Sequence, residues 1–198
     1  MPEEVLITLN SFRSEAIDWC KGKNWAFRIP FLIFFVYVLT RHLSDPMYSS
    51  VLAPLNLGIH ELGHFIFSFA GSFLATLGGT IFQLFVPLFG IFNFYRQTDF
   101  FSMALCFGWI STNFFSIATY VADARRLELP LVTPFGGDNV VHDWEYILSR
   151  MNILQYDTFL ATIIRVFAVI SMLACFVSGA WLLWQMHRNP KTGRSYTG

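Results

Sequence analysis

The sequence predicts an all-α, polytopic integral membrane protein with about five transmembrane helices and an interfacial helix at its N-terminus. Hydrophobic residues make up 55% of the 198 residues and charged residues only 13%, whereas a soluble protein carries roughly 25% charged residues. The mean hydropathy is +0.50. The charged residues gather near the chain ends and in short stretches, which leaves long uncharged tracts that contain many of the 23 Phe residues. Such tracts are typical of segments that lie in a bilayer.

Charge and cysteine content exclude two classes of function. The 13 Lys and Arg residues balance the 13 Asp and Glu residues, so the chain lacks the polycationic surface on which nucleic-acid binding depends. The three cysteines are far apart and form no CxxC pair. We therefore expect no nucleic-acid partner, no disulfide framework and no thiolate metal site.

Residues 1–24 form an amphipathic N-terminal segment. It has no apolar core followed by a small-residue cleavage site, so we expect no signal peptide. Its apolar residues recur at intervals of three and four, which places them on one helical face: Val5, Leu9, Phe12, Ala16 and Trp19. This pattern fits two placements equally well: a helix on the membrane surface and a helix docked on the rest of the protein.

The helical membrane domain is expected over residues 25–186, with a loop at 123–158 and a polar tail at 187–198. A transmembrane helix needs about 20 mainly apolar residues, and five segments qualify: Trp25–Leu43, Val51–Thr76, Leu77–Tyr95, Phe100–Ala122 and Phe159–Met186. Glycines and Pro87 interrupt the third segment, so a broken helix or a re-entrant hairpin is an alternative there.

Five spans predict that the two termini face opposite sides of the membrane. Seven Lys and Arg residues then share the N-terminal side: Arg13, Lys21, Lys23, Arg28, Arg125, Arg126 and Arg150. Five occupy the other side: Arg41, Arg96, Arg188, Lys191 and Arg194. The positive-inside rule favours a cytoplasmic N-terminus.

The second predicted span contains the chemistry-bearing motif, His60-Glu61-Leu62-Gly63-His64. Residues four apart on a helix project from nearly the same face, one turn apart, so the two imidazoles can share one zinc ion. Glu61 can reach a water on that ion and act as general base. By composition, about 0.004 such HExxH matches are expected in a shuffled chain, and ionisable groups inside a membrane segment are usually functional.

The motif in a membrane helix of a small polytopic protein resembles the intramembrane zinc metalloproteases of the site-2 protease class, most closely the bacterial M50-like membrane proteins. The resemblance implies zinc ligation by His60, His64 and an Asp on a later helix, with Glu61 as the base. It also implies a bacterial inner (cytoplasmic) membrane location. The resemblance is specific for about 25 residues around the motif. The Leu-Asp-Gly pattern that supplies the third ligand in that class is absent, since no Asp-Gly occurs in the chain.

The third zinc ligand must therefore come from elsewhere in the chain. We predict Asp123, at the end of the fourth span, with His142 as the alternative and Asp143 as a residue that orients the ligands. If Asp123 is the ligand, the second span must end near Gly71 and the fourth must continue towards Leu129. The Gly136-Gly137 turn offers the other solution, because it lets the acidic loop fold back and deliver His142. Two buried amides, Gln83 and Asn113, favour interhelical hydrogen bonding over binding of a substrate backbone.

Two functions from different classes remain open. The first is a zinc-dependent peptidase that hydrolyses a peptide bond of a membrane-protein or peptide substrate in or near the bilayer. The second is a non-catalytic, protease-like subunit or scaffold that binds lipid and other membrane subunits. The small size, the missing Leu-Asp-Gly pattern and the Phe-rich spans favour the scaffold, whereas the HExxH spacing favours the peptidase.

Overall fold

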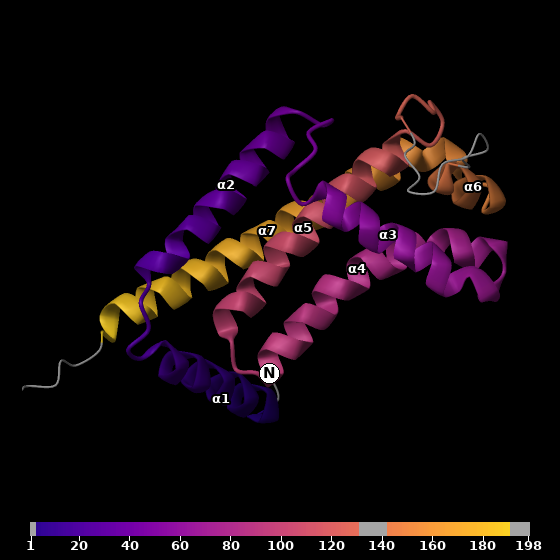
Figure 1. The fold of residues 1–198 in the computed structure, drawn as a ribbon. Coiled ribbons are helices and arrows are strands. Elements are labelled where there is room, and N and C mark those ends of the chain that lie inside the picture. The colour runs from indigo at the N-terminus through magenta and orange to yellow at the C-terminus, as the bar shows by residue number, and fades with distance from the viewer. Residues whose placement is uncertain (1–2, 131–141, 191–198) are drawn as a thin grey trace, which may run out of the picture.

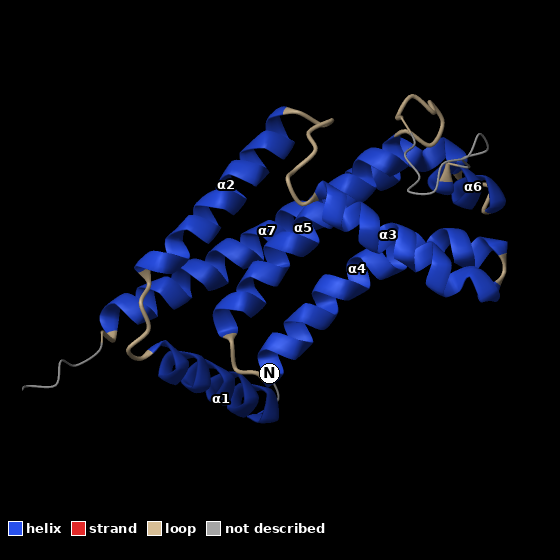
Figure 2. Ribbon diagram, in the orientation of Figure 1, coloured by secondary structure: helices blue, strands red, loops and turns tan. Residues whose placement is uncertain are grey.

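A computed structural model describes residues 3–130 and 142–190 of the chain. Every regular element in these residues is a helix (Figure 2). Five helices form the bundle: α2 (Ile29–Ser44), α3 (Ala53–Phe67), α4 (Ser72–Arg96), α5 (Phe100–Ala122) and α7 (Asp157–Arg188). Two more lie at its ends, α1 (Glu3–Cys20) and α6 (Asp143–Arg150) (Figure 1). The predicted all-α class is confirmed.

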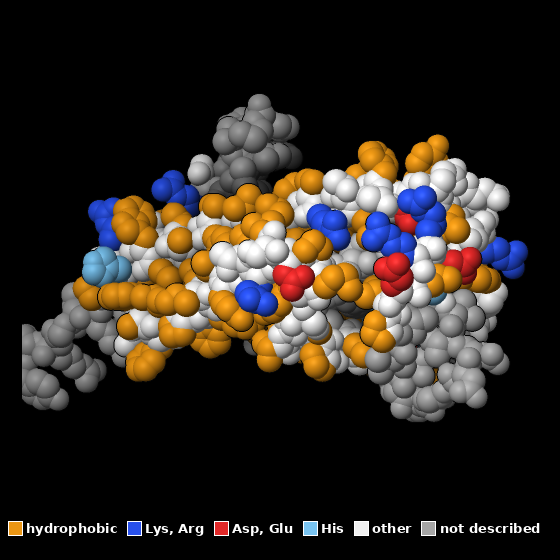
Figure 3. Space-filling model, turned by 90° about the horizontal axis from the view of Figure 1, so that it is seen from above, with side chains coloured by type: hydrophobic (Ala, Val, Ile, Leu, Met, Phe, Trp, Pro, Cys, Tyr) orange, Lys and Arg blue, Asp and Glu red, His pale blue; other side chains and the backbone are white. Residues whose placement is uncertain are grey.

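Four helices are long and apolar enough to cross a membrane, which makes the chain a polytopic membrane protein by length and composition. The spans are Ala26–Ser44, Ser72–Arg96, Phe100–Ala122 and Leu154–Arg188. The α5 helix is central, with 61% of its apolar window buried, whereas the other three have 17% to 28% buried. Their outward faces carry exposed aromatic side chains such as Phe27, Phe31, Phe85 and Phe89. Figure 3 shows hydrophobic side chains over much of one face, with charged side chains mainly over the half that holds α6.

The predicted span Val51–Thr76 does not form one helix. The α3 helix has only 15 residues, and a short 3-10 turn leads to Gly71, whose φ of +87° favours glycine. The chain reverses there, and α4 returns beside α3 as the second arm of a hairpin (Figure 1). The α4 helix is continuous from Ser72 to Arg96 with Pro87 inside it, so the alternative of a broken third span is wrong.

The α3 helix reaches only about half of the way along the bundle. Before it, the Thr119 hydroxyl donates to the Pro46 carbonyl near the end of α5. The chain then turns back towards the middle of α5. There the indole of Trp109 donates a hydrogen bond at 2.8 Å to Asn56, which lies near the start of α3. The α3 helix thus begins at mid-depth and ends level with the beginning of α4.

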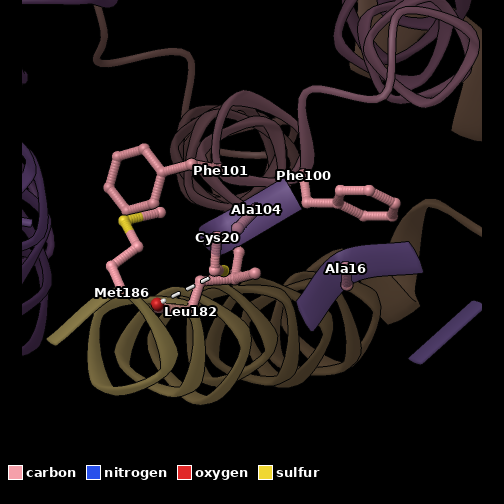
Figure 4. Close-up of a cluster of buried hydrophobic side chains, with 7 residues drawn as sticks. All are labelled: Ala16, Cys20, Phe100, Phe101, Ala104, Leu182 and Met186. Carbon is pink, nitrogen blue, oxygen red and sulfur yellow. Dashed lines mark hydrogen bonds between the residues drawn. The ribbon is translucent and has the colours of Figure 1, made fainter. Parts of the chain in front are cut away.

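The residues that flank the four candidate spans, Gly22 before the first and Asn189 after the last, meet at the same end of the bundle, so the expectation that five spans separate the two ends of the chain is wrong. Four spans return the chain to the side on which it started. The Gly22 amide donates to the Asn189 carbonyl at 2.9 Å, just beyond α1 and α7. Beneath this contact, α1 packs on α5 and α7 through a buried apolar cluster (Figure 4): Ala16, Cys20, Phe100, Phe101, Ala104, Leu182 and Met186. Of the two placements open for the amphipathic segment, the structure shows it docked on the bundle.

The opposite end of the bundle holds α6. The Ile147 and Leu148 side chains of α6 are buried, and Leu148 packs with Ile117 and Val121 of α5 and Ala161 of α7. The Gly136-Gly137 turn and most of the polar tail lie outside the described residues.

Candidate metal centre

The two motif histidines lie one turn apart on α3, as their spacing predicts. Their ring centroids are 4.6 Å apart and the ring planes are nearly perpendicular. The His60 side chain is 7% exposed and the His64 side chain 26%. A pair of close imidazoles on a partly covered helix face is the arrangement that two zinc ligands require.

Glycines let α4 approach this face of α3 closely. A Cβ atom on Gly63 of α3 would lie 2.3 Å from the Gly78 carbonyl oxygen of α4. A Cβ atom on Gly79 would lie 2.6 Å from His60 Nε2 and 2.7 Å from His64 Nε2. Because these three positions have no side chain, the α4 backbone can lie directly against both imidazoles.

A directed chain of hydrogen bonds determines which nitrogen of His60 carries its proton. The Trp109 carbonyl can only accept, so Asn113 Nδ2 donates to it and Asn113 Oδ1 is the acceptor for Gln83 Nε2 at 2.9 Å. The Gln83 Oε1 atom then faces His60 Nδ1 at 3.1 Å and accepts a hydrogen bond from the Nδ1–H group. The neutral His60 ring therefore presents its lone pair at Nε2. Gln83 and Asn113 thus hydrogen-bond between helices, the role we favoured for them.

The same tautomer is selected at His64 by a backbone group. The Ala75 carbonyl oxygen of α4 lies 2.8 Å from His64 Nδ1, and a carbonyl can only accept a hydrogen bond. In the neutral ring the Nδ1 atom is therefore protonated and Nε2 carries the lone pair. A metal-binding histidine commonly donates its other ring N–H in this way, which fixes the orientation of the ring.

Both Nε2 atoms face one carboxylate oxygen, and it belongs to Asp143 at the first position of α6. The Asp143 Oδ2 atom lies 2.9 Å from His60 Nε2 and 3.2 Å from His64 Nε2. The three potential ligand atoms lie within 4.8 Å of one another, and they form the one such group found in the described residues. Burial raises the pKa of the Asp143 carboxyl, but imidazoles that carry a proton at Nε2 donate hydrogen bonds to it when no metal is bound, and these lower the pKa to below its usual value. Asp143 is therefore ionised at neutral pH, as a metal ligand must be.

The structure brings Asp143, and not the predicted Asp123, to the histidines. The α3 helix does end before Gly71, as that prediction required, but α5 stops at Ala122 instead of continuing. The Asp123 carboxylate closes the turn after α5: Oδ1 accepts from the Glu128 amide and Oδ2 from the Leu129 amide, both at 3.0 Å.

The alternative ligand, His142, also has another role. Its Nδ1 atom accepts from the Glu145 amide at 3.2 Å and so caps the N-terminus of α6. Its Nε2 atom lies 3.4 Å from Asp123 Oδ2. Asp143, which we expected to orient the ligands, takes the place expected for the third ligand itself.

Glu61 follows His60 on α3, so its side chain projects about 100° further round the helix. The side chain is partly exposed, and it contributes to the electrostatic field at His64 and at Tyr120. No described residue forms a hydrogen bond or an ion pair with it. Among the described residues, Glu61 is thus a carboxylate next to the histidines that no other side chain engages.

Two imidazole nitrogens and one carboxylate oxygen are a ligand set that fits zinc. Zinc sites with three protein ligands keep a fourth position for water or substrate, which distinguishes catalytic from structural sites. No protein-family model, no curated protein and no solved structure matches the chain. The resemblance to the site-2 protease class therefore stays a prediction, and the geometry of the site carries the functional argument.

Proposed function

We propose that the protein is a zinc-dependent membrane hydrolase that cleaves peptide bonds in or near the bilayer. The convergence of His60 Nε2 and His64 Nε2 on Asp143 Oδ2 carries this proposal. In the neutral rings, hydrogen bonds at both Nδ1 atoms leave two nitrogen lone pairs and a carboxylate facing the same point. Three mutually repelling acceptors at such short range are stabilised by a shared cation or proton, and this donor set suits zinc.

The chemistry follows from the placement of the four side chains. Zinc, when bound, lowers the pKa of a coordinated water and polarises a substrate carbonyl. His60, His64 and Asp143 would hold the ion, and Glu61 would accept a proton from the attacking water. Glu61 then delivers this proton to the departing amine, so one carboxylate serves as base and acid in turn.

The depth of the site suggests where a substrate bond would lie. Ala75 and Gly79, which contact the histidines, are within the first two turns of α4. At 1.5 Å per residue, the site is about 5 to 10 Å inside the end of that span. The scissile bond would therefore lie near the membrane boundary on the side of α6, and the substrate would be a membrane protein or a peptide held there.

Charge distribution suggests the orientation. Near the span ends, six described basic residues share the end that holds the chain termini: Arg13, Lys21, Lys23, Arg28, Arg96 and Arg188. Four lie near the α6 end: Arg41, Arg125, Arg126 and Arg150. By the positive-inside rule, both termini face the cytoplasm and the metal centre faces the other side. The membrane that the resemblance implies is the bacterial inner membrane.

Metal content and one point variant test the proposal. Purified chain in mild detergent should contain one zinc per molecule by elemental analysis. Glu61→Gln should retain the zinc, because Glu61 is not a ligand, and should lose peptide cleavage. A chain without stoichiometric zinc would refute the metal centre. Zinc retention together with unchanged cleavage by Glu61→Gln would refute the role of this base.

A second candidate, a non-catalytic subunit of a larger membrane assembly, is favoured by the outer face of α4. Four phenylalanines spaced three or four residues apart stack in a row along it, with ring centroids 5.9 to 6.4 Å apart: Phe82, Phe85, Phe89 and Phe92. The last three are more than half exposed, and lipid or a partner helix can cover them. A stable complex that keeps its full function when both His60 and His64 are Ala would support this candidate over the peptidase.

A further inference from the structure

Asp143 lies at the end of a short helix, where the backbone is poorly held, although a metal ligand needs a well-fixed position. It is the first residue of α6, a helix of only eight residues, and short helices are unstable alone and fray at their ends. A metal ligand must hold its donor atom to within about 0.2 Å. The end of α6 therefore needs contacts that hold it in place beyond its own helical hydrogen bonds.

Two side chains at the end of α5, Tyr120 and Asp123, supply such contacts together with His142, the N-cap residue of α6. The Tyr120 hydroxyl accepts the Asp143 backbone N–H at 3.1 Å, which is a donor that has no partner within α6. The Tyr120 ring packs against the His142 ring, with centroids 4.2 Å apart. The Tyr120 side chain thus contacts both Asp143, through a hydrogen bond to its backbone, and the preceding residue His142, through the ring contact.

A second set of contacts involves His142 and Asp123. His142 Nδ1 caps α6 by accepting from the Glu145 amide, so in the neutral ring its Nε2 carries the proton. This buried Nε2 lies 3.4 Å from Asp123 Oδ2, within ion-pair distance, but it forms no hydrogen bond with any residue in the described part of the chain. Two backbone amides hold the Asp123 carboxylate in turn. The cap of α6 therefore lies against the turn that Asp123 closes at the end of α5.

We propose that Tyr120, His142 and Asp123 are positioning residues that hold the Asp143 carboxylate in register with His60 and His64. This proposal rests on the metal centre of the proposed function. None of the three residues binds the metal, and each acts through the first turn of α6. Their loss loosens the third ligand while leaving the two histidines and the transmembrane bundle intact.

The experiment uses the full chain in detergent and two conservative variants. His142→Asn keeps an N-cap residue, since Asn is among the best caps, but removes the group that faces Asp123. Tyr120→Phe keeps the ring contact and removes the hydroxyl. Tyr146→Phe is the matched control, because it removes another hydroxyl that ties α6 to the bundle, 3.0 Å from Ser72 Oγ, without touching Asp143. His187→Asn, at the far end of α7, controls for loss of a histidine.

Zinc affinity is measured by competition with a chelator, and ligand geometry by the visible absorption spectrum of Co²⁺ bound in place of zinc. His142→Asn and Tyr120→Phe should each weaken zinc binding about 10- to 100-fold, as loss of a group that orients a metal ligand typically does. They should also alter the Co²⁺ spectrum without lowering the Tm of the metal-free chain. Both controls should match the wild type.

The outcomes separate this proposal from the proposed function. Wild-type chain that binds Co²⁺ and zinc, with unchanged affinity and spectrum in both variants, overturns the positioning role and leaves the metal centre standing. Equal weakening by Tyr146→Phe also overturns it, since docking of α6 in general would then explain the loss. Wild-type chain that binds neither ion overturns the metal centre and this proposal with it. If His142→Asn fails to fold, Tyr120→Phe alone decides.

Discussion

Replacing Gly79 with Ala should abolish zinc binding while leaving the fold intact. Gly79 lies on α4 directly against the two histidines, and an added Cβ would be 2.6 Å from His60 Nε2 and 2.7 Å from His60 Cε1 and His64 Nε2. Non-bonded heavy atoms normally approach to about 3.5 Å. The methyl group therefore intrudes about 0.8 Å into the space of both rings at the nitrogens that would bind the metal.

The rings have little freedom to give way. Gln83 Oε1 holds His60 at Nδ1, and the Ala75 carbonyl holds His64 at Nδ1. A displacement of about 0.8 Å is four times the tolerance of about 0.2 Å for metal–ligand distances. The stability of the α4 helix should not decrease, because Ala is favoured over Gly in a helix interior by about 0.5 to 1 kcal/mol.

The assay is zinc content and affinity of the purified variant, together with its thermal unfolding. Gly58→Ala is the matched control, since Gly58 is exposed on α3 and a Cβ atom there meets nothing within 4 Å. We expect the control to bind zinc like the wild type and Gly79→Ala to bind none. Wild-type zinc affinity in Gly79→Ala would refute the placement of the ion between the two Nε2 atoms.

Three further predictions test the ligands and the topology. Gln83→Leu should weaken zinc binding about 10- to 100-fold, because His60 loses the acceptor that selects its tautomer; equal affinity in a chelator competition would contradict this. Asp143→Ala should remove stoichiometric zinc, and a full complement by elemental analysis would show that another residue is the third ligand. Cysteines introduced by Lys21→Cys and Arg188→Cys, both at exposed positions in a chain whose own three cysteines are buried, should react with an impermeant maleimide from the same side of sealed vesicles. Labelling from opposite sides would contradict four spans.

Local features of the chain could be predicted from the sequence because they depend on residues close together in it. The predicted span Phe100–Ala122 agrees with α5 at both ends, since a long apolar run forms a helix in a bilayer whatever its neighbours are. The facing of His60 and His64 follows from helix geometry alone. These local rules were sufficient for the all-α class and for the two histidines of the site.

The number of spans required the tertiary structure. Residues 51–76 are apolar enough to suggest one span, and hydropathy does not distinguish one long helix from a hairpin that turns at Gly71. The hairpin forms because Gly63 and Gly78 let α3 and α4 pack backbone to backbone, and because Asn56 is satisfied by Trp109 at mid-depth. One span fewer changes which side each following loop faces.

The candidate third ligand and its surroundings were also decided by tertiary packing. Asp143 reaches His60 from 83 positions further along the chain, and Asp123 is occupied by a turn that forms only after α5 has ended. Gln83 and Gly79 matter because one face of α4 lies against α3. No local sequence pattern predicts these contacts, because they form where helices pack side by side. The number of residues between two helices does not tell how far apart they lie in space. The amino-acid sequence shows which residues can bind a metal, whereas the packing of α4 and α6 on α3 selects the ones that meet.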